Sequence, residues 1–175
     1  MTYENAVYLK ITLLCGYKDE LWAYVDQALV EQDPLSDVVL ELSTAGSDDK
    51  KLLSVLNEHL LKIRDSDIDY NKTVFDLVMS FLKRKYVEDS MSMADITSLM
   101  YRIAVYTERY LDEPWHTMYF MGDIFAEAEA GVVDKEDYQR IFDAFLNEGI
   151  CFCDYPSPKP KESILKRIIE KLLGK

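Results

Sequence analysis

The spacing of apolar residues is the feature that most constrains the fold of this chain. From Ser92 onward, apolar side chains recur every three or four residues, which places them on one face of an α-helix. Ser92 followed by Asp95 is a variant of the capping box that begins helices, and Glu113-Pro114 is expected to end this one. Its predicted inward face consists of Ile96, Leu99, Met100, Ile103, Thr107, Tyr110 and Leu111.

A second segment with the same period begins at Asp134 and ends at Gly149. Glu136 and Asp137 lie in its first turn, where the partial positive charge of a helix favours carboxylates. Glycine readily adopts the left-handed conformation that commonly follows a helix, so Gly149 is the predicted end. The predicted buried face consists of Tyr138, Ile141, Phe142, Phe145 and Leu146.

Weaker signals predict five further helices. They cover 18–32, a segment opened by Pro34 and stopped by Gly46, a segment capped by Ser47 that runs to Ile63, 74–86, and 115–130.

The first segment of the chain is ambiguous. Val7, Leu9, Ile11 and Leu13 alternate as in a strand, whereas Ala6, Leu9, Ile11 and Leu14 fit a helix closed by Gly16. Because no partner strand is evident, we predict a helix over 6–14. The predicted fold class is therefore all-α, an irregular multi-helix bundle or helical array of about eight or nine helices, without an internal repeat.

The chain divides near its C-terminal end. Its 175 residues suit one domain with an appendage. Tyr155-Pro-Ser-Pro-Lys-Pro holds the backbone extended, and a short basic amphipathic helix, Glu162 to Leu173, is predicted after it. We therefore expect an acidic helical domain over 1–155, with 156–175 forming a proline-rich linker and a basic helix that docks on that domain.

The charge of the chain is strongly acidic and unevenly placed. The formal net charge is −12, and residues 111–155 alone carry eleven acids against two bases. Such a surface repels nucleic acid and anionic membranes and attracts a basic protein. No apolar run reaches the length of a membrane span. Three cysteines fit no disulfide framework and no signal peptide is evident, so the expected location is the cytoplasm.

One acidic segment has the spacing of a calcium loop, from Asp65 to Asp76. Asp67 and Asp69 occupy ligand positions, but Tyr70 stands where the loop needs glycine for its sharp turn. Asp76 is also too short to replace the usual bidentate glutamate. We therefore interpret the segment as an acidic interhelical loop in which Asp69 caps the next helix, and predict no metal site.

Other candidates for chemistry are equally weak. His59 lies beside an apolar stripe, where a hydrogen-bonded, partly buried imidazole is expected. Cys151-Phe-Cys153 has neither zinc nor redox spacing. No glycine-flanked nucleophilic serine and no phosphate-binding glycine loop is evident. The sequence thus predicts no catalytic residue and no cofactor.

A candidate partner-binding surface lies in the most acidic block. On a helix from Trp115, His116 shares a face with Phe120, Asp123 and Glu127, a span too long for one metal ion. Most aromatic residues from Tyr101 to Phe125 are expected in the core, with Trp115 and Phe120 as possible anchors for a partner. The predicted partner-binding residues are Asp112, Glu113, Trp115, His116, Phe120, Asp123 and Glu127.

The chain resembles the small acidic helical immunity proteins encoded beside bacterial toxins. The resemblance rests on Pro34-Leu-Ser-Asp-Val-Val-Leu-Glu-Leu-Ser-Thr-Ala-Gly, Asp48-Asp-Lys-Lys-Leu-Leu-Ser-Val-Leu-Asn and Trp115-His within an acidic half. It implies a non-enzymatic inhibitor that neutralises a basic toxin by direct contact. Two alternatives stay open: a helical scaffold, adaptor or oligomerisation protein, and an enzyme whose metal is held by carboxylates, although Glu-x-x-His pairs are absent.

Overall fold

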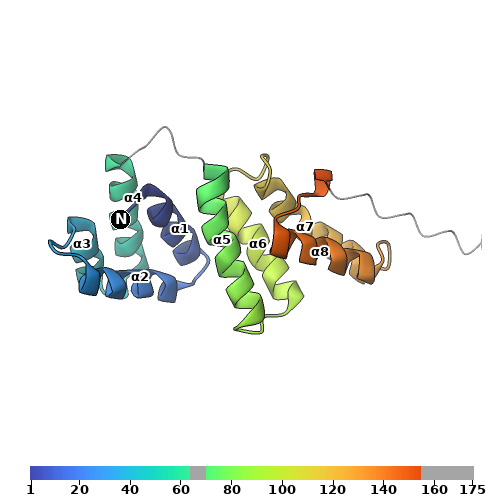
Figure 1. The fold of residues 1–175 in the computed structure, drawn as a ribbon, viewed down its shortest axis with the longest axis horizontal. Coiled ribbons are helices and arrows are strands. Elements are labelled where there is room, and N and C mark those ends of the chain that lie inside the picture. Colours follow the sequence, from blue (N-terminus) through green and yellow to red (C-terminus); the bar gives the residue numbers. More distant parts are fainter. Residues whose placement is uncertain (64–69, 155–175) are drawn as a thin grey trace, which may run out of the picture. The chain divides into compact units, whose positions relative to one another are not determined.

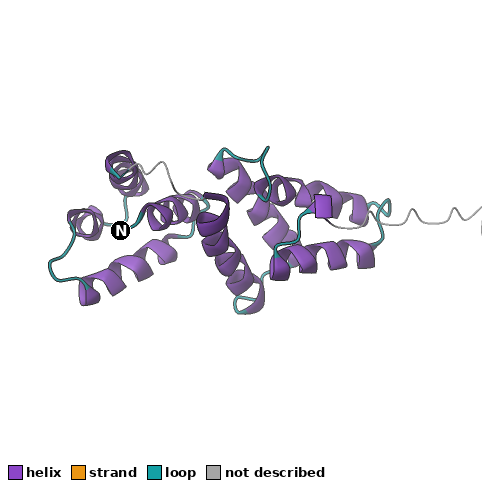
Figure 2. Ribbon diagram, turned by 45° about the horizontal axis from the view of Figure 1, so that its top comes forward, coloured by secondary structure: helices purple, strands orange, loops and turns teal. Residues whose placement is uncertain are grey.

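A computed structural model describes residues 1–63 and 70–154, and the regular structure of these residues is helical (Figures 1 and 2). The all-α prediction is confirmed, including a helix for the ambiguous first segment. The elements are α1 Tyr3–Leu14, α2 Lys18–Glu31, α3 Asp37–Ala45, α4 Asp49–Lys62, α5 Tyr70–Val87, α6 Met93–Thr107, α7 Trp115–Glu129, α8 Lys135–Glu148 and the short 3₁₀ helix η1 Phe152–Asp154.

Side-chain caps begin several of these helices. Ser92 Oγ accepts the backbone N–H of Asp95 at the start of α6, as the sequence predicts. Asp134 Oδ1 accepts the N–H of Glu136 at the start of α8. Each cap satisfies a backbone donor that has no partner within its helix.

Several predicted helix ends are displaced. Helix α3 begins at Asp37 after the N-cap Ser36, three residues beyond Pro34. The cap of α4 is Asp48, whose carboxylate accepts two backbone N–H groups, and Ser47 lies outside the helix. Helix α6 ends at Thr107, because Glu108 adopts the left-handed conformation (φ 58°) and its N–H turns back to the Val105 carbonyl. Residues 108–114 are therefore a connection and not a continuation of α6.

The chain divides into two compact units, Met1–Gly122 and a second that begins at Asp123 within α7. In the first unit, α1 packs against α2, α4, α5 and α6 (Figure 1). Its apolar face thereby joins one core formed with α2, α3 and α4. That core consists of Leu9, Leu13, Leu21, Val25, Ala28, Val38, Val39, Leu42, Ala45, Leu52, Val55 and Leu56.

A polar contact ties three helices of the first unit together. The Glu20 carboxylate on α2 accepts the hydroxyl of Tyr8 on α1 and the guanidinium of Arg84 on α5, each at 2.6 Å. Burial, together with this carboxylate, raises the pKa of Tyr8 above its ordinary value. Tyr8 therefore stays a donor to Glu20 throughout the physiological pH range.

In the second unit, α8 buries the face that the sequence predicts: Tyr138, Ile141, Phe142, Phe145 and Leu146. Phe125 of α7 packs edge-on against Tyr138, with ring centroids 5.4 Å apart. The predicted basic helix and linker, 156–175, lie outside the described residues.

Candidate functional site

Partly exposed aromatic side chains gather where α6 connects to α7. Tyr119 lies at the centre, with its ring centroid 4.9 Å from Tyr101, 5.2 Å from Tyr110 and 5.1 Å from Phe120. The His116 ring lies 4.7 Å from that of Phe120. We call these five residues, Tyr101, Tyr110, His116, Tyr119 and Phe120, the aromatic patch.

The patch retains much of its surface in contact with solvent. Tyr101 is 46% exposed, Tyr110 39% and Phe120 37%. Removing a large ring from water lowers the free energy. A single exposed apolar residue is ordinary on a protein surface, whereas a connected group of exposed rings marks an interaction surface. The aromatic patch is therefore the best candidate for a functional site in the described residues.

Local geometry assembles the patch from two helices and their connection. His116, Tyr119 and Phe120 are three and four residues apart on α7, so they share one helical face. Tyr101 lies on α6. Tyr110 reaches the patch because the left-handed turn at Glu108 releases it from the helix.

Carboxylates lie in the same connection. The Glu113 carboxylate accepts the backbone N–H of Thr117 (3.1 Å) and lies 3.5 Å from His116 Nδ1, so it is held against the first turn of α7. Asp112 and Glu108 are exposed. The predicted residues Asp112, Glu113, His116 and Phe120 are thus brought together in the first unit.

Trp115 does not belong to this surface, contrary to the sequence-based assignment. It is fully buried, and its ring meets that of Phe75 edge-on at 5.5 Å. The first residue of α7 faces α5 because burying the indole removes the largest apolar side chain of that turn from water. Trp115 therefore packs the core and cannot contact a partner.

Asp123 and Glu127 lie on α7 within the second unit, and both are exposed. Their accessibility is consistent with a binding role, which stays a prediction.

Sequence analysis missed Tyr101, Tyr110 and Tyr119 as surface residues, because most aromatic residues of this stretch are expected in the core and the spacing places Tyr110 on the inward face of the helix from Ser92. The available signal was the density of aromatic residues between 101 and 125.

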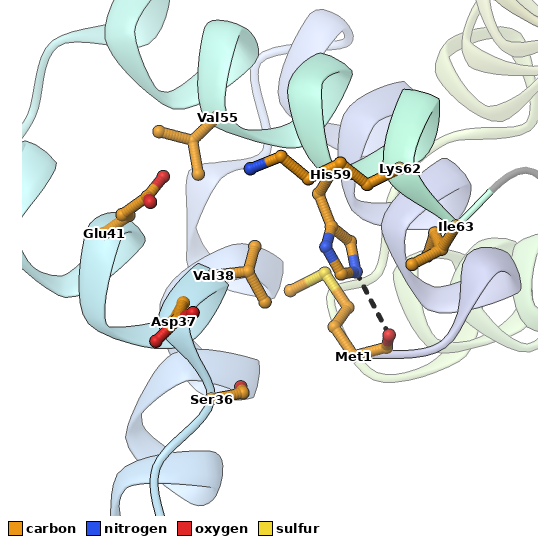
Figure 3. Close-up of a pocket in the computed structure, with 9 residues that line it drawn as sticks. All are labelled: Met1, Ser36, Asp37, Val38, Glu41, Val55, His59, Lys62 and Ile63. Carbon is orange, nitrogen blue, oxygen red and sulfur yellow. Dashed lines mark hydrogen bonds between the residues drawn. The ribbon is translucent and has the colours of Figure 1, made fainter.

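A separate pocket of about 260 Å³ opens between the N-terminal turn of α3 and the C-terminal turns of α4 (Figure 3). The Met1 side chain points into it, with Val38 and Val55 around it. Asp37 and Glu41 of α3 line one wall, and His59 and Lys62 of α4 line the other. The complete lining is Met1, Ser36, Asp37, Val38, Glu41, Val55, His59, Lys62 and Ile63.

A serine and a histidine both line this pocket, but each is hydrogen-bonded to another group and not to the other. Ser36 Oγ donates to Gln32 Oε1 at 2.9 Å, while His59 Nε2 bonds the Met1 carbonyl at 3.1 Å. A nucleophile and its base must instead bond each other. His59 is thus the partly buried, hydrogen-bonded imidazole that the sequence predicts.

The acidic segment with the spacing of a calcium loop is only partly described. Asp65, Asp67 and Asp69 lie outside the described residues, whereas 70–76 belong to helix α5. A helical backbone from Tyr70 differs from the sharp turn and ligand loop that calcium requires at those positions. Within 1–63 and 70–154, no group of three or more His, Cys, Asp or Glu side chains is placed to hold a metal ion.

Comparison of the chain with models of protein families, with curated proteins and with solved structures finds no match. Among the described helices, none is both long and apolar enough to cross a bilayer. The function must therefore be argued from the aromatic patch and its charge.

Proposed function

We propose that this protein is a non-enzymatic acidic binding protein that contacts a basic protein through the aromatic patch and the carboxylates beside it. In its most specific form, the proposal is that it is an immunity protein that neutralises a basic bacterial toxin by direct protein-protein contact. The location in this proposal is the cytoplasm, where thiols stay reduced, because the three cysteines fit no disulfide framework.

The observation that carries the proposal is the connected, exposed group of rings flanked by Asp112 and Glu113. Protein interfaces concentrate their binding free energy in aromatic residues that become desolvated inside a polar rim. A net charge of −12 accelerates encounter with a basic partner, and the rings then slow dissociation. The Glu113 carboxylate accepts the backbone N–H of Thr117 and lies 3.5 Å from His116 Nδ1, which holds its negative charge at the start of α7.

A photo-crosslinking amino acid placed at Phe120 tests the proposal in cells of the source organism. The matched control carries the same group at Val30, which is 86% exposed and lies on α2, away from the patch. We expect position 120 to form one abundant adduct with a basic protein and position 30 to form none.

The purified partner and protein should then form a complex whose association rate falls as salt concentration rises. Adducts with a second copy of the chain from position 120 would instead favour the oligomerisation alternative. Identical adducts from both positions would show that the patch has no specific partner.

A further inference from the structure

The pocket between α3 and α4 carries charges of opposite sign on its two walls. Asp37 and Glu41 lie four residues apart and share one face of α3. His59 and Lys62 lie three residues apart on α4. Figure 3 shows the Glu41 carboxylate and the Lys62 ammonium turned toward the same space, with Val55 between them in this view. A small ligand that carries both charges can therefore contact both walls at once.

The charges on the two walls do not neutralise each other. Among residues 1–63 and 70–154, no ion pair or side-chain hydrogen bond engages Asp37, Glu41 or Lys62. All three side chains belong to exposed residues, so each charge stays hydrated at the rim of the pocket. Both signs of charge are consequently accessible to a ligand that enters.

The interior of the pocket accepts an apolar side chain and a carbonyl group. The Met1 side chain points into it, and the Met1 carbonyl accepts the Nε2–H of His59 at 3.1 Å. Val38 and Val55 are buried in the floor, and Ile63 is half-buried beside them. With Met1 in place, the pocket still has a volume of about 260 Å³. Sites for drug-sized molecules begin at about 300 Å³, so this one suits a ligand of amino-acid size.

We propose that this pocket binds a free α-amino acid with an aliphatic side chain. The ammonium group of the ligand lies against the Glu41 carboxylate, with Asp37 one helical turn away. Its carboxylate accepts an N–H of Lys62, and its side chain packs on Val38 and Val55. A ligand with a single charge pairs with one wall and gains nothing from the other. The site is separate from the aromatic patch, and its ligand is of a different class from the basic partner.

The test titrates the full-length protein with L-leucine and with three analogues that each lack one group. The analogue 4-methylpentanoate lacks the ammonium, 3-methylbutylamine lacks the carboxylate, and glycine lacks the side chain. Nuclear magnetic resonance follows the methyl groups of Val38 and Val55 and the ring protons of His59. We expect leucine to shift these resonances saturably, with a dissociation constant of about 1 mM or lower.

The analogues should bind more weakly for two different reasons. Exposed ion pairs contribute modestly, so we expect each single-charge analogue to bind at least about threefold more weakly than leucine. Glycine should bind at least about tenfold more weakly, because it buries no apolar side chain.

Substitutions then assign each charge of the ligand to a wall. Lys62→Met should weaken leucine binding about threefold or more and leave the binding of 3-methylbutylamine unchanged, because that analogue has no carboxylate. Glu41→Gln should weaken leucine binding to a similar extent and leave 4-methylpentanoate unaffected. The matched controls are Lys51→Met and Glu88→Gln, which make the same charge changes at exposed positions that do not line the pocket. Circular dichroism of each variant verifies that the helices are retained.

Three outcomes would overturn the amino-acid site. Equal affinity for leucine and both single-charge analogues would show that the walls do not recognise charge. Equal losses in Lys62→Met and Lys51→Met would attribute the effect to net charge and not to the pocket. Resonances of Val38 and Val55 that do not move at saturating leucine would place any binding elsewhere. Crosslinking from position 120 tests partner binding separately, and its result does not alter this one.

Discussion

At the scale of single residues, Glu20 is the carboxylate whose charge most depends on its hydrogen-bond partners. Its side chain is only 15% exposed and accepts two hydrogen bonds from two other helices, one of them from a cation. This contact raises the pKa of Arg84 further, so the guanidinium stays charged and depends on its carboxylate partner.

Glu20→Gln should therefore destabilise the first unit. The amide removes the negative charge that faces Arg84 and turns one acceptor into a donor, so we expect the free energy of unfolding to fall by about 1–3 kcal/mol. Asp49→Asn is the control, because its ion pair with Lys18 is more exposed and should cost less than about 1 kcal/mol. Urea denaturation measures both variants, and equal losses would contradict a special role for the Glu20 contact.

Cys15 and Cys153 should differ sharply in reactivity. Burial raises the pKa of the Cys15 thiol to about 11, whereas Cys153 is exposed. In the folded protein at pH 8, we expect iodoacetamide to modify Cys153 at least about tenfold faster than Cys15. Mass spectrometry of peptides from timed samples gives the two rates, and urea should abolish the difference.

The raised pKa of Cys15 also makes the stability of the protein depend on pH in a defined direction. Because the folded pKa of Cys15 exceeds the unfolded one, its contribution to stability is complete below the unfolded pKa and is lost as the pH rises toward 11. Comparable labelling of both thiols in the folded protein would show that Cys15 is not protected by burial.

Which aromatic residues are buried could not be read from the sequence alone. Helix α7 carries large apolar side chains on more than one face, so periodicity does not distinguish Trp115, Met118 and Met121, which are buried, from Phe120, which is exposed. The packing partner decides: Phe75 of α5 covers Trp115. Such contacts between segments distant in sequence leave no local signal.

At the scale of the secondary-structure elements, the sequence predicts helices better than their ends. The ends of α8 are predicted because Asp134 and Gly149 each have a local reason to stop a helix. The end of α6 is not, because Glu108 has no intrinsic preference for the left-handed conformation. Tyr110 is consequently assigned to a helix face that does not exist.

Glu108→Gly should stabilise the protein by about 1 kcal/mol, because glycine adopts φ near 58° without the steric cost that a Cβ imposes. Glu88→Gly is the matched control, since Glu88 follows α5 and does not have a positive φ. There, added freedom of the unfolded chain should lower stability or leave it unchanged. Thermal denaturation compares the two variants; a loss of stability in both would indicate that the Glu108 side chain makes a needed interaction.

At the scale of the whole molecule, charge reversals can distinguish long-range attraction of a partner from direct contact with it. Three double reversals to lysine change the net charge by the same amount: Glu108 with Asp112 beside the patch, Asp123 with Glu127 in the second unit, and Asp37 with Glu41 on α3. Each should slow association with a basic partner to a similar extent at low salt.

Only reversals within the interface should also accelerate dissociation. We expect the pair beside the patch to weaken the complex by about 2 kcal/mol or more, and Asp123 with Glu127 to do the same if the interface extends along α7. Pairs outside the interface should cost less than about 1 kcal/mol. Surface plasmon resonance at several salt concentrations gives both rates. An unchanged dissociation rate for the first two pairs, with binding abolished by the α3 pair, would place the interface on the other acidic block.

The connection that Glu108 opens has a consequence for how proteins of this kind diversify. Residues 108–114 connect α6 to α7 and are not part of the buried faces of these helices. Of these residues, Tyr110 stacks its ring on that of Tyr119 in α7. Inserting or deleting a residue there changes which rings meet at the surface while the hydrophobic interior keeps its packing, since surface connections tolerate changes in length. Recognition can thus diverge between related chains faster than architecture, and lineages that share this helical framework should differ most in this short stretch.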